Sequence, residues 1–378
     1  MVKKITVSKI MSDSEIASKE GEHFDEKHYK TIVDEDADVY TTDGKLLLKL
    51  RKNVFPKSLT DKALASYRKV AKAKKDNRGA SAGTLDRNKL PSYVGKLVNE
   101  KKCRTGFISA VSGKKSSQLV GNLAPSNIIG YYDKIDRNYA NQNAAPCRLT
   151  AFNRDHPDLW ENSIDFLKAA DRQFKKLVPK AHSNQLKQCQ AVPDFAIDDT
   201  AFSTVTVNYS WRTALHKDAG DYMDGFGNLM VIEDHENPNK YAGAYTGFPQ
   251  YGVAANVRTG DFLAMDVHEW HANTEFRPVN QVAGNYKKRD IDNQWHYNRL
   301  SIVCYLREKM IRCKDMDFSK YEQKSHKMTG GGYEEEVAEN KSIENNRSSN
   351  IDNLKEKIFN LLPSEWVNYI KTNYDLLD

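Results

Sequence analysis

Hydrophobic positions recur at helical spacing in three stretches of the chain. This spacing collects apolar side chains on one face and predicts helices at residues 58–75, 157–177 and 354–369. Pro179 should end the second helix, and the third should dock back on the core. The apolar positions of the first two helices are Leu59, Ala63, Tyr67 and Val70, followed by Leu159, Ile164, Leu167, Phe174 and Leu177.

From residue 201 the pattern changes to short runs rich in β-branched and aromatic residues, separated by Gly, Pro, Asn and Asp. Successive strands without helices between them favour an antiparallel sandwich or barrel over a Rossmann sheet. The upstream helices would then pack on one sheet, which makes the expected fold class α+β. The predicted strands cover residues 202–211, 228–233, 252–257, 261–266 and 300–306, after an earlier hairpin at 38–50 around Asp43-Gly44.

Composition divides the chain into five expected parts. Residues 1–30 are charged and poor in large apolar groups, which predicts a flexible N-terminal arm. Residues 31–200 should form a helical and mixed region packed on the core, and residues 201–320 should form the core itself. The polar segment 321–350 predicts a mobile linker before a C-terminal helix in residues 351–378.

The distribution of charge is more informative than the net charge of +6. Lysines and arginines greatly outnumber acids in residues 68–115, which fits either a solvated helix face with its loops or contacts with phosphate groups. Hydrophobic residues make up 39% of the chain, enough for a packed core, and no apolar run is long enough to cross a bilayer. We therefore expect a soluble protein with no membrane partner and no obligate protein partner.

The five cysteines are widely spaced, and no two of them form a Cys-x-x-Cys pair. An odd number at this spacing fits neither a disulfide framework nor a structural zinc site. Free thiols in the reducing interior of a cell are the simplest expectation.

A predicted strand leads into His216-Lys217-Asp218. Residues two apart in an extended segment face the same side, so an imidazole and a carboxylate converge as two thirds of a facial metal triad. The motif alone is weak, because His-x-Asp is common by chance. A second signal follows the strand at 261–266, which leads into His268 and His271. His271 is the preferred third ligand, reaching the metal from the opposite side of the sandwich, and His268 is the competing candidate.

Arg299 begins an otherwise apolar predicted strand. A buried guanidinium is costly without an anion, and its planar fork suits two-point contact with a carboxylate. We therefore predict that Arg299 binds the distal carboxylate of a 2-oxoacid cosubstrate. Ser301, on the same strand face, and Asn208 are further candidates for binding it. The alternative is a buried ion pair between Arg299 and an acidic residue of the fold.

The order of these motifs over residues 200–310 resembles the 2-oxoglutarate- and iron-dependent dioxygenases. The resemblance implies a double-stranded β-helix, or jelly-roll, core in which Fe(II) is held by His216, Asp218 and His271. It also implies that Arg299 binds 2-oxoglutarate and that dioxygen is the oxidant. Arg299 lies farther beyond the distal histidine than is usual, because residues 276–297 resemble an insertion.

Within this superfamily the chain resembles the TET/JBP branch, which oxidises the 5-methyl group of cytosine or thymine in nucleic acid. The similar features are Ala-Gly-Asp at 219–221, His-Ala-Asn-Thr at 271–274 and, as in algal and viral members, Gly-Tyr-Tyr-Asp at 130–133 and Cys-Arg-Leu-Thr at 147–150. The resemblance implies DNA as substrate and partner, gripped by the basic residues 68–115, and a nuclear location if the source is eukaryotic. Some algal relatives use ascorbate in place of 2-oxoglutarate, and Asp221 is the candidate contact for it.

Two other functions stay open. A protein or small-molecule hydroxylase would use the same iron centre, whereas a non-catalytic basic nucleic-acid-binding protein would need none. Iron-dependent release of succinate from 2-oxoglutarate would exclude the non-catalytic function. Product analysis on methylated DNA, compared with unmodified DNA and peptides, would separate the two enzymes.

Overall fold

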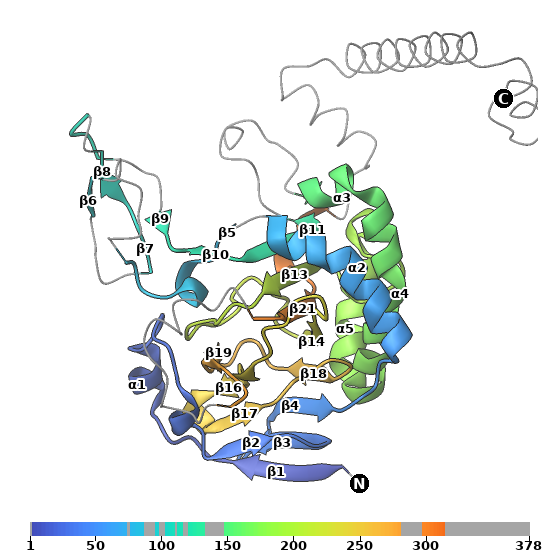
Figure 1. Ribbon diagram of the computed structural model, residues 1–378, viewed down its shortest axis with the longest axis horizontal. Coiled ribbons are helices and arrows are strands. Elements are labelled where there is room, and N and C mark those ends of the chain that lie inside the picture. The colour runs from blue at the N-terminus through green and yellow to red at the C-terminus, as the bar shows by residue number, and fades with distance from the viewer. Residues whose placement is uncertain are drawn as a thin grey trace, which may run out of the picture. The chain divides into compact units, whose positions relative to one another are not determined.

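Two β-sheets face each other in the computed structural model of the protein (Figure 1). Within the described residues, the larger sheet has nine strands in the order β1-β3-β4-β18-β14-β21-β13-β11-β12. The smaller sheet has four, in the order β19-β16-β17-β2. Within these two sheets β1 pairs with β3, and β17 with β2, in parallel, whereas neighbours such as β14 and β21 are antiparallel.

The structure describes residues 2–73, 76–86, 95–97, 103–109, 112–115, 120–132, 147–280 and 297–313. The expected linker and C-terminal helix lie outside these residues, as does most of the expected insertion. The larger sheet comprises β1 (Lys3–Val7), β3 (Ala37–Thr41), β4 (Leu46–Arg51), β11 (Ser126–Tyr132), β12 (Arg148–Leu149), β13 (Thr204–Tyr209), β14 (Gly227–Glu233), β18 (Phe262–Met265) and β21 (Arg299–Tyr305). The smaller comprises β2 (Thr31–Val33), β16 (Thr246–Phe248), β17 (Val253–Ala255) and β19 (Ala272–Asn273).

The remaining elements are helices and short ladders. The α-helices are α1 (Asp13–Ala17), α2 (Lys57–Ala73), α3 (Ala151–Asp155), α4 (Pro157–Leu177) and α5 (Pro179–Gln190). The 3-10 helices are η1 (Glu26–His28), η2 (Gly79–Ala82), η5 (Pro193–Phe195), η6 (Pro249–Tyr251) and η8 (Glu308–Cys313). Two-stranded ladders join β5 (Asp76–Asn77) to β10 (Leu123–Ala124), β6 (Lys96–Leu97) to β8 (Phe107–Ile108), β7 (Arg104–Thr105) to β9 (Val120–Gly121) and β15 (Ala242–Gly243) to β20 (Phe276–Arg277). No described helix is both long and apolar enough to cross a bilayer.

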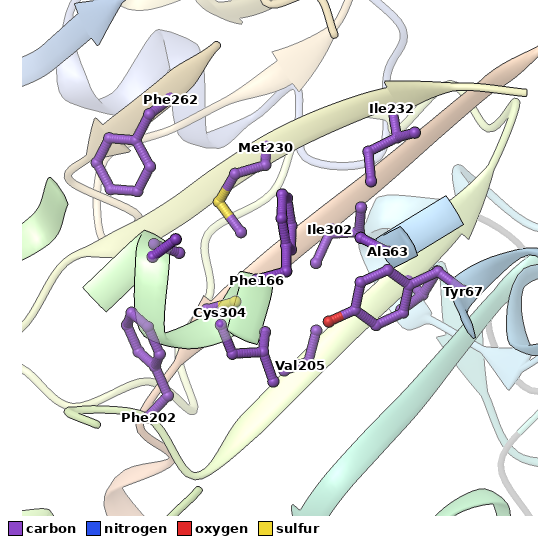
Figure 2. Close-up of a cluster of buried hydrophobic side chains, with 14 of the residues drawn as sticks. Ala63, Tyr67, Phe166, Phe202, Val205, Met230, Ile232, Phe262, Ile302 and Cys304 are labelled. Carbon is purple, nitrogen blue, oxygen red and sulfur yellow. The ribbon is translucent and has the colours of Figure 1, made fainter. Parts of the chain in front are cut away.

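Helices α2 and α4 cover one face of the larger sheet (Figure 1). Every second residue of β21 points into this layer, including Ile302 and Cys304, which lie beside Phe166 of α4 in Figure 2. Phe166 is completely buried and packs on Phe55 with 5.2 Å between ring centroids. The alternation of β21 sends Ser301, Val303 and Tyr305 to the opposite face, toward the smaller sheet.

A second hydrophobic core fills the space between the two sheets. It joins residues such as Leu229 and Leu263 of the larger sheet to Phe248 and Val253 of the smaller one. Two facing sheets, with helices on the outer face of one of them, form a double-stranded β-helix in an α+β protein. The expected fold class is confirmed, and the predicted strands at 202–211, 228–233, 252–257, 261–266 and 300–306 correspond to β13, β14, β17, β18 and β21.

The expectation of a flexible arm at residues 1–30 is wrong for the elements formed there. Strand β1 pairs in register with β3, and α1 begins with a capping box in which Ser12 and Glu15 bond each other's backbone N–H groups. Ile16, in this helix, is completely buried. Edge pairing and one buried anchor order a segment whose composition is mostly polar.

Pro179 does not only end a helix; it begins another. Helix α4 ends at Leu177, and Pro179 is the first residue of α5, where the missing N–H group costs nothing. Helix α5 was not predicted, because its sequence has few large apolar residues. The β-sheet core does not begin at residue 201 as expected, because β1, β3, β4, β11 and β12 precede that residue and belong to the larger sheet.

The expectation that all cysteines are free thiols is also wrong. Cys147 and Cys313 form a disulfide, with 6.3 Å between their Cα atoms. It joins the start of β12 to the end of η8, two segments far apart in sequence. Cys103, Cys189 and Cys304 are free.

Candidate metal centre

His216 and His271 lie directly opposite each other on neighbouring extended segments. The backbone N–H of each donates to the carbonyl oxygen of the other, with both N···O distances at 3.0 Å. This pairing brings the ring centroids to 4.3 Å. His271 directly precedes β19 of the smaller sheet, whereas His216 lies beyond the end of β13 of the larger sheet. Backbone pairing between the two segments aligns the two side chains.

Asp218 completes a compact group with the two histidines. Its carboxylate oxygens lie 3.6 Å from Nε2 of His216 and 3.7 Å from Nε2 of His271. The three potential ligand atoms all lie within 4.8 Å of one another. His268 is outside this group, and its Nε2 is 3.2 Å from the carbonyl oxygen of Tyr222. Of the two competing histidines, the structure brings His271 to the site.

Hydrogen bonds fix which ring nitrogen of each histidine faces Asp218. Nδ1 of His216 donates to the carbonyl of Ala214 at 2.7 Å, and Nδ1 of His271 donates to that of Glu269 at 2.9 Å. A carbonyl can only accept, so both Nδ1 atoms carry the proton and both Nε2 atoms keep a lone pair in the neutral ring. Two imidazole lone pairs and one carboxylate converge on one point, which fits a divalent transition metal with open coordination positions.

The protonation states at the site also suit metal binding. Burial, reinforced by the neighbouring His271, lowers the pKa of His216 to about 4, so its ring is neutral at pH 7. Burial by itself would raise the pKa of Asp218, but the two histidines and Arg78 outweigh it and lower that pKa. The group therefore offers a carboxylate and a neutral imidazole without first losing a proton.

A cavity of about 340 Å³ surrounds the three residues. Asn208 and Ser301 line it from adjacent strands of the larger sheet, and Nδ2 of Asn208 donates to Oγ of Ser301 at 3.1 Å. Oδ1 of Asn208 is buried without a hydrogen-bond partner. Lys217 and Ala219, beside the metal-binding candidates, are exposed. The cavity therefore opens to solvent at 217–219, whereas its Asn208–Ser301 wall is inside the protein.

Arg299 lies beyond the interior end of this cavity. It is 2% exposed and follows the alternation of β21, which puts it on the same face as Ser301. Its Nε and Nη2 atoms have no hydrogen-bond partner, and burial lowers its pKa. The described residues show no ion pair for this guanidinium, contrary to the alternative of a buried salt bridge. Arg299 does not line the cavity itself; Ser301 is the nearest residue of β21 that does.

Asp221 lies in the cavity wall near the opening. It is buried, its N–H donates to the carbonyl of Asp218 at 3.2 Å, and its backbone pairs with that of Arg307. Three other residues line the cavity: Arg78, which belongs to the basic stretch 68–115, and Thr206 and Tyr305, which sequence reasoning did not single out. Thr206 and Tyr305 are ordinary strand residues, and only the sheet register brings their hydroxyl oxygens to 3.0 Å from each other.

Residues 127–308 match a family model, Tet_JBP, described as the oxygenase domain of the 2OGFeDO superfamily. This segment is a Tet_JBP oxygenase domain. It contains all three metal-binding candidates and Arg299, whereas Arg78 and the 3-10 helix η2 lie outside the matched residues.

The chain is also similar to two thymine dioxygenases. The chain is 33% identical over 189 residues to the bifunctional helicase and thymine dioxygenase JBP2 of Leishmania braziliensis, covering 50% of this chain and 15% of that protein. It is 30% identical over 233 residues to the thymine dioxygenase JBP1 of Trypanosoma brucei brucei, covering 61% and 24%. The chain thus spans a quarter or less of these relatives. A solved complex of NgTET1 with 5mC DNA aligns with a TM-score of 0.41 and 10% identity, over 74% of this chain and 83% of that one.

Proposed function

We propose that this protein is a 2-oxoglutarate- and Fe(II)-dependent dioxygenase that oxidises the 5-methyl group of a methylated pyrimidine, 5-methylcytosine or thymine, in DNA. The observation that carries the proposal is the convergence of two imidazole nitrogens and one carboxylate, all within 4.8 Å, on a cavity inside a Tet_JBP domain. The superfamily's name supplies the class of metal and cosubstrate. The names of the JBP relatives supply the class of substrate.

In this proposal Nε2 of His216, Nε2 of His271 and the Asp218 carboxylate hold Fe(II). The bound iron would supply the activation of dioxygen that the oxidation of a methyl C–H bond requires. The backbone carbonyls of Ala214 and Glu269 keep both imidazole rings turned toward the metal by accepting their Nδ1 protons. His216 does not have to lose a proton for binding, because burial keeps its ring neutral at pH 7.

The interior end of the cavity is the proposed site of 2-oxoglutarate. The unpartnered guanidinium nitrogens of Arg299 would bind its distal carboxylate in a two-point contact. Ser301 and the free acceptor of Asn208 would provide neutral hydrogen bonds beside it. The alternative cosubstrate is ascorbate, for which Asp221 in the cavity wall is the candidate contact.

The substrate base would enter through the exposed opening at 217–219. A methyl group inside a DNA duplex cannot reach atoms that lie within a cavity, so the base must be flipped out of the stack. A cavity of about 340 Å³ lies at the lower end of the usual range for small-ligand pockets, which suits a single base better than a larger group. An enzyme acting on DNA works where DNA is stored, so we expect a nuclear location if the source is eukaryotic.

The test is product analysis with each component omitted in turn. Purified protein is incubated with Fe(II), 2-oxoglutarate, ascorbate and DNA containing 5-methylcytosine, and succinate and modified bases are quantified. Unmodified DNA, which supplies thymine, and peptides serve as alternative substrates. His216→Ala and Asp218→Ala should abolish turnover, and His235→Ala, which removes an exposed histidine outside the cavity, should not.

Each outcome has one meaning. Product on either pyrimidine supports the proposal and identifies the base. Succinate release that responds only to peptides or small molecules would identify a different hydroxylase. Binding of DNA without iron-dependent turnover would leave a non-catalytic protein. Turnover that needs ascorbate and not 2-oxoglutarate would replace the cosubstrate and the role given to Arg299.

A further inference from the structure

The open end of the cavity carries positive side chains that the iron site and the 2-oxoglutarate site do not use. Arg78, Lys217 and Arg307 all line the cavity. The guanidinium of Arg307 lies 4.5 Å from the ring centroid of Tyr132 and also covers Gly220, where an added Cβ would approach its Nη2 to 3.2 Å. Arg307 is thus packed into the cavity wall. Arg78 and Lys217 are the two remaining cationic side chains of the wall, and the proposed iron and 2-oxoglutarate sites give them no role.

Arg78 reaches the cavity from outside the Tet_JBP segment. It follows β5, which pairs with β10, and it precedes the 3-10 helix η2. Two hydrogen bonds fix this turn: Oγ of Ser81 donates to the carbonyl of Arg78 at 2.9 Å, and the N–H of Ala214 donates to the carbonyl of Ser81 at 2.9 Å. Because Ala214 lies two residues before His216, the turn that carries Arg78 is attached directly to the metal-binding segment.

The position of Arg78 makes an anionic ligand the simplest partner for its side chain. Its Nε atom is buried without a hydrogen-bond partner, although the residue lines a cavity and is only half-buried. A guanidinium N–H without an acceptor is costly in such a place and is relieved by a bound carboxylate or phosphate. Asp218 and Asp221 are the carboxylates of the cavity wall, and Asp218 is assigned to the metal.

The two ends of the cavity are too far apart for Arg78 to share the cosubstrate with Arg299. The wall strand β21 runs from Arg299 to Tyr305, about 20 Å at roughly 3.3 Å per residue. Arg78 lies near the Tyr305 end, where it and Arg307 both act to lower the pKa of the Tyr305 phenol against the larger, opposite effect of burial. Lys217 marks the same end, since it is exposed at the opening.

We propose that Arg78 and Lys217 bind a phosphodiester group of the nucleic-acid strand whose base enters the cavity. This inference rests on the proposed function for the identity of the ligand. When the base is inside, the sugar–phosphate backbone stays at the opening, where these two cations lie. Arg78 supplies a fork fixed by the 78–81 turn, and Lys217, whose amine lies 5.1 Å from the ring centroid of Trp270, supplies a second charge.

The experiment measures binding of the full-length protein to a short DNA duplex with one central 5-methylcytosine, by fluorescence anisotropy over a series of salt concentrations. Each phosphate contact contributes about 0.9 to the slope of log affinity against log salt concentration. Arg78→Gln should reduce the slope by about 1 and weaken binding at low salt about 10-fold or more. Arg78→Lys should keep the slope because it keeps the charge. Lys175→Gln, which removes an exposed charge from α4 outside the cavity, should change neither value by more than about twofold.

Two results would overturn the phosphate contact. One is an unchanged slope in Arg78→Gln, and weaker binding at that unchanged slope would mean an uncharged contact with the base. The other is a raised KM for 2-oxoglutarate in Arg78→Gln, which would mean a cosubstrate contact. The binding measurement requires no turnover, so it is independent of the enzymatic test. A slope reduced by about 1 in Arg78→Gln, together with an inactive wild-type protein, would refute the oxygenase and support the phosphate contact. An active wild-type enzyme whose Arg78→Gln variant keeps the slope would support the oxygenase and refute the phosphate contact.

Discussion

Replacing Arg299 by methionine should weaken the binding of 2-oxoglutarate while leaving the protein at least as stable. Arg299 is 2% exposed, and two of its guanidinium nitrogens have no hydrogen-bond partner. Replacing a poorly paired buried charge by an apolar side chain of similar volume is neutral or stabilising, by about 1–4 kcal/mol. Without cosubstrate, Arg299→Met should therefore unfold in urea at the same or a higher free energy than the wild type.

When the cosubstrate is bound, Arg299→Met should be destabilising relative to the wild type. Removing one partner of a buried ion pair costs about 3–5 kcal/mol, because the other charge is left uncompensated. At about 1.4 kcal/mol per factor of ten, the affinity for 2-oxoglutarate should fall roughly 100- to 5000-fold. The stabilisation that the wild type gains from saturating 2-oxoglutarate and Fe(II), measured by thermal unfolding without oxygen, should be greatly reduced in the variant.

Arg258→Met is the matched control. Arg258 is also near this end of the fold, but its Nε donates to Asn256 at 2.8 Å and its guanidinium lies 4.2 Å from the ring centroid of Tyr241. Its loss should lower stability and affect cosubstrate affinity far less. The reasoning is refuted if Arg299→Met alone is destabilised by more than about 2 kcal/mol without cosubstrate, since a well-paired arginine would behave in that way.

Three further predictions address the fold and the site. Phe166→Ala should cost about 3–5 kcal/mol in urea unfolding because it empties a fully buried aromatic site on α4, and a cost under 1 kcal/mol would contradict the packing described. Cys313→Ser should lower stability by about 2–4 kcal/mol relative to the oxidised wild type, and reductant should remove the difference; equal stability under oxidising conditions would mean that Cys147 and Cys313 are not bonded. The pKa of His216 is lowered to about 4, so the unfolded state binds more protons than the folded state between pH 6.5 and 4. The metal-free protein should therefore lose up to about 3 kcal/mol as the pH falls through that window, and an equal loss in His216→Asn would show that another group is responsible.

Local patterns determined much of the fold. Short runs rich in β-branched and aromatic residues identified β13, β14, β18 and β21. Helical spacing identified α2 and α4, because that periodicity reports which face of a helix is buried. The same reasoning brought His216 and Asp218 to one side of an extended segment. It also singled out Arg299, since a charge at the start of an apolar strand is visible in the sequence itself.

Pairing between segments far apart in the sequence decided the features that local patterns did not predict. The choice between His268 and His271 depended on which of them pairs with His216 along the backbone. These segments are more than fifty residues apart, and neither sequence alone determines the register in which they pair. The same holds for the disulfide, for β1 at the edge of the larger sheet and for Arg78, which reaches the cavity only because its turn is bonded to Ala214. Periodicity records whether a side chain is buried; only the folded chain decides what it is buried against.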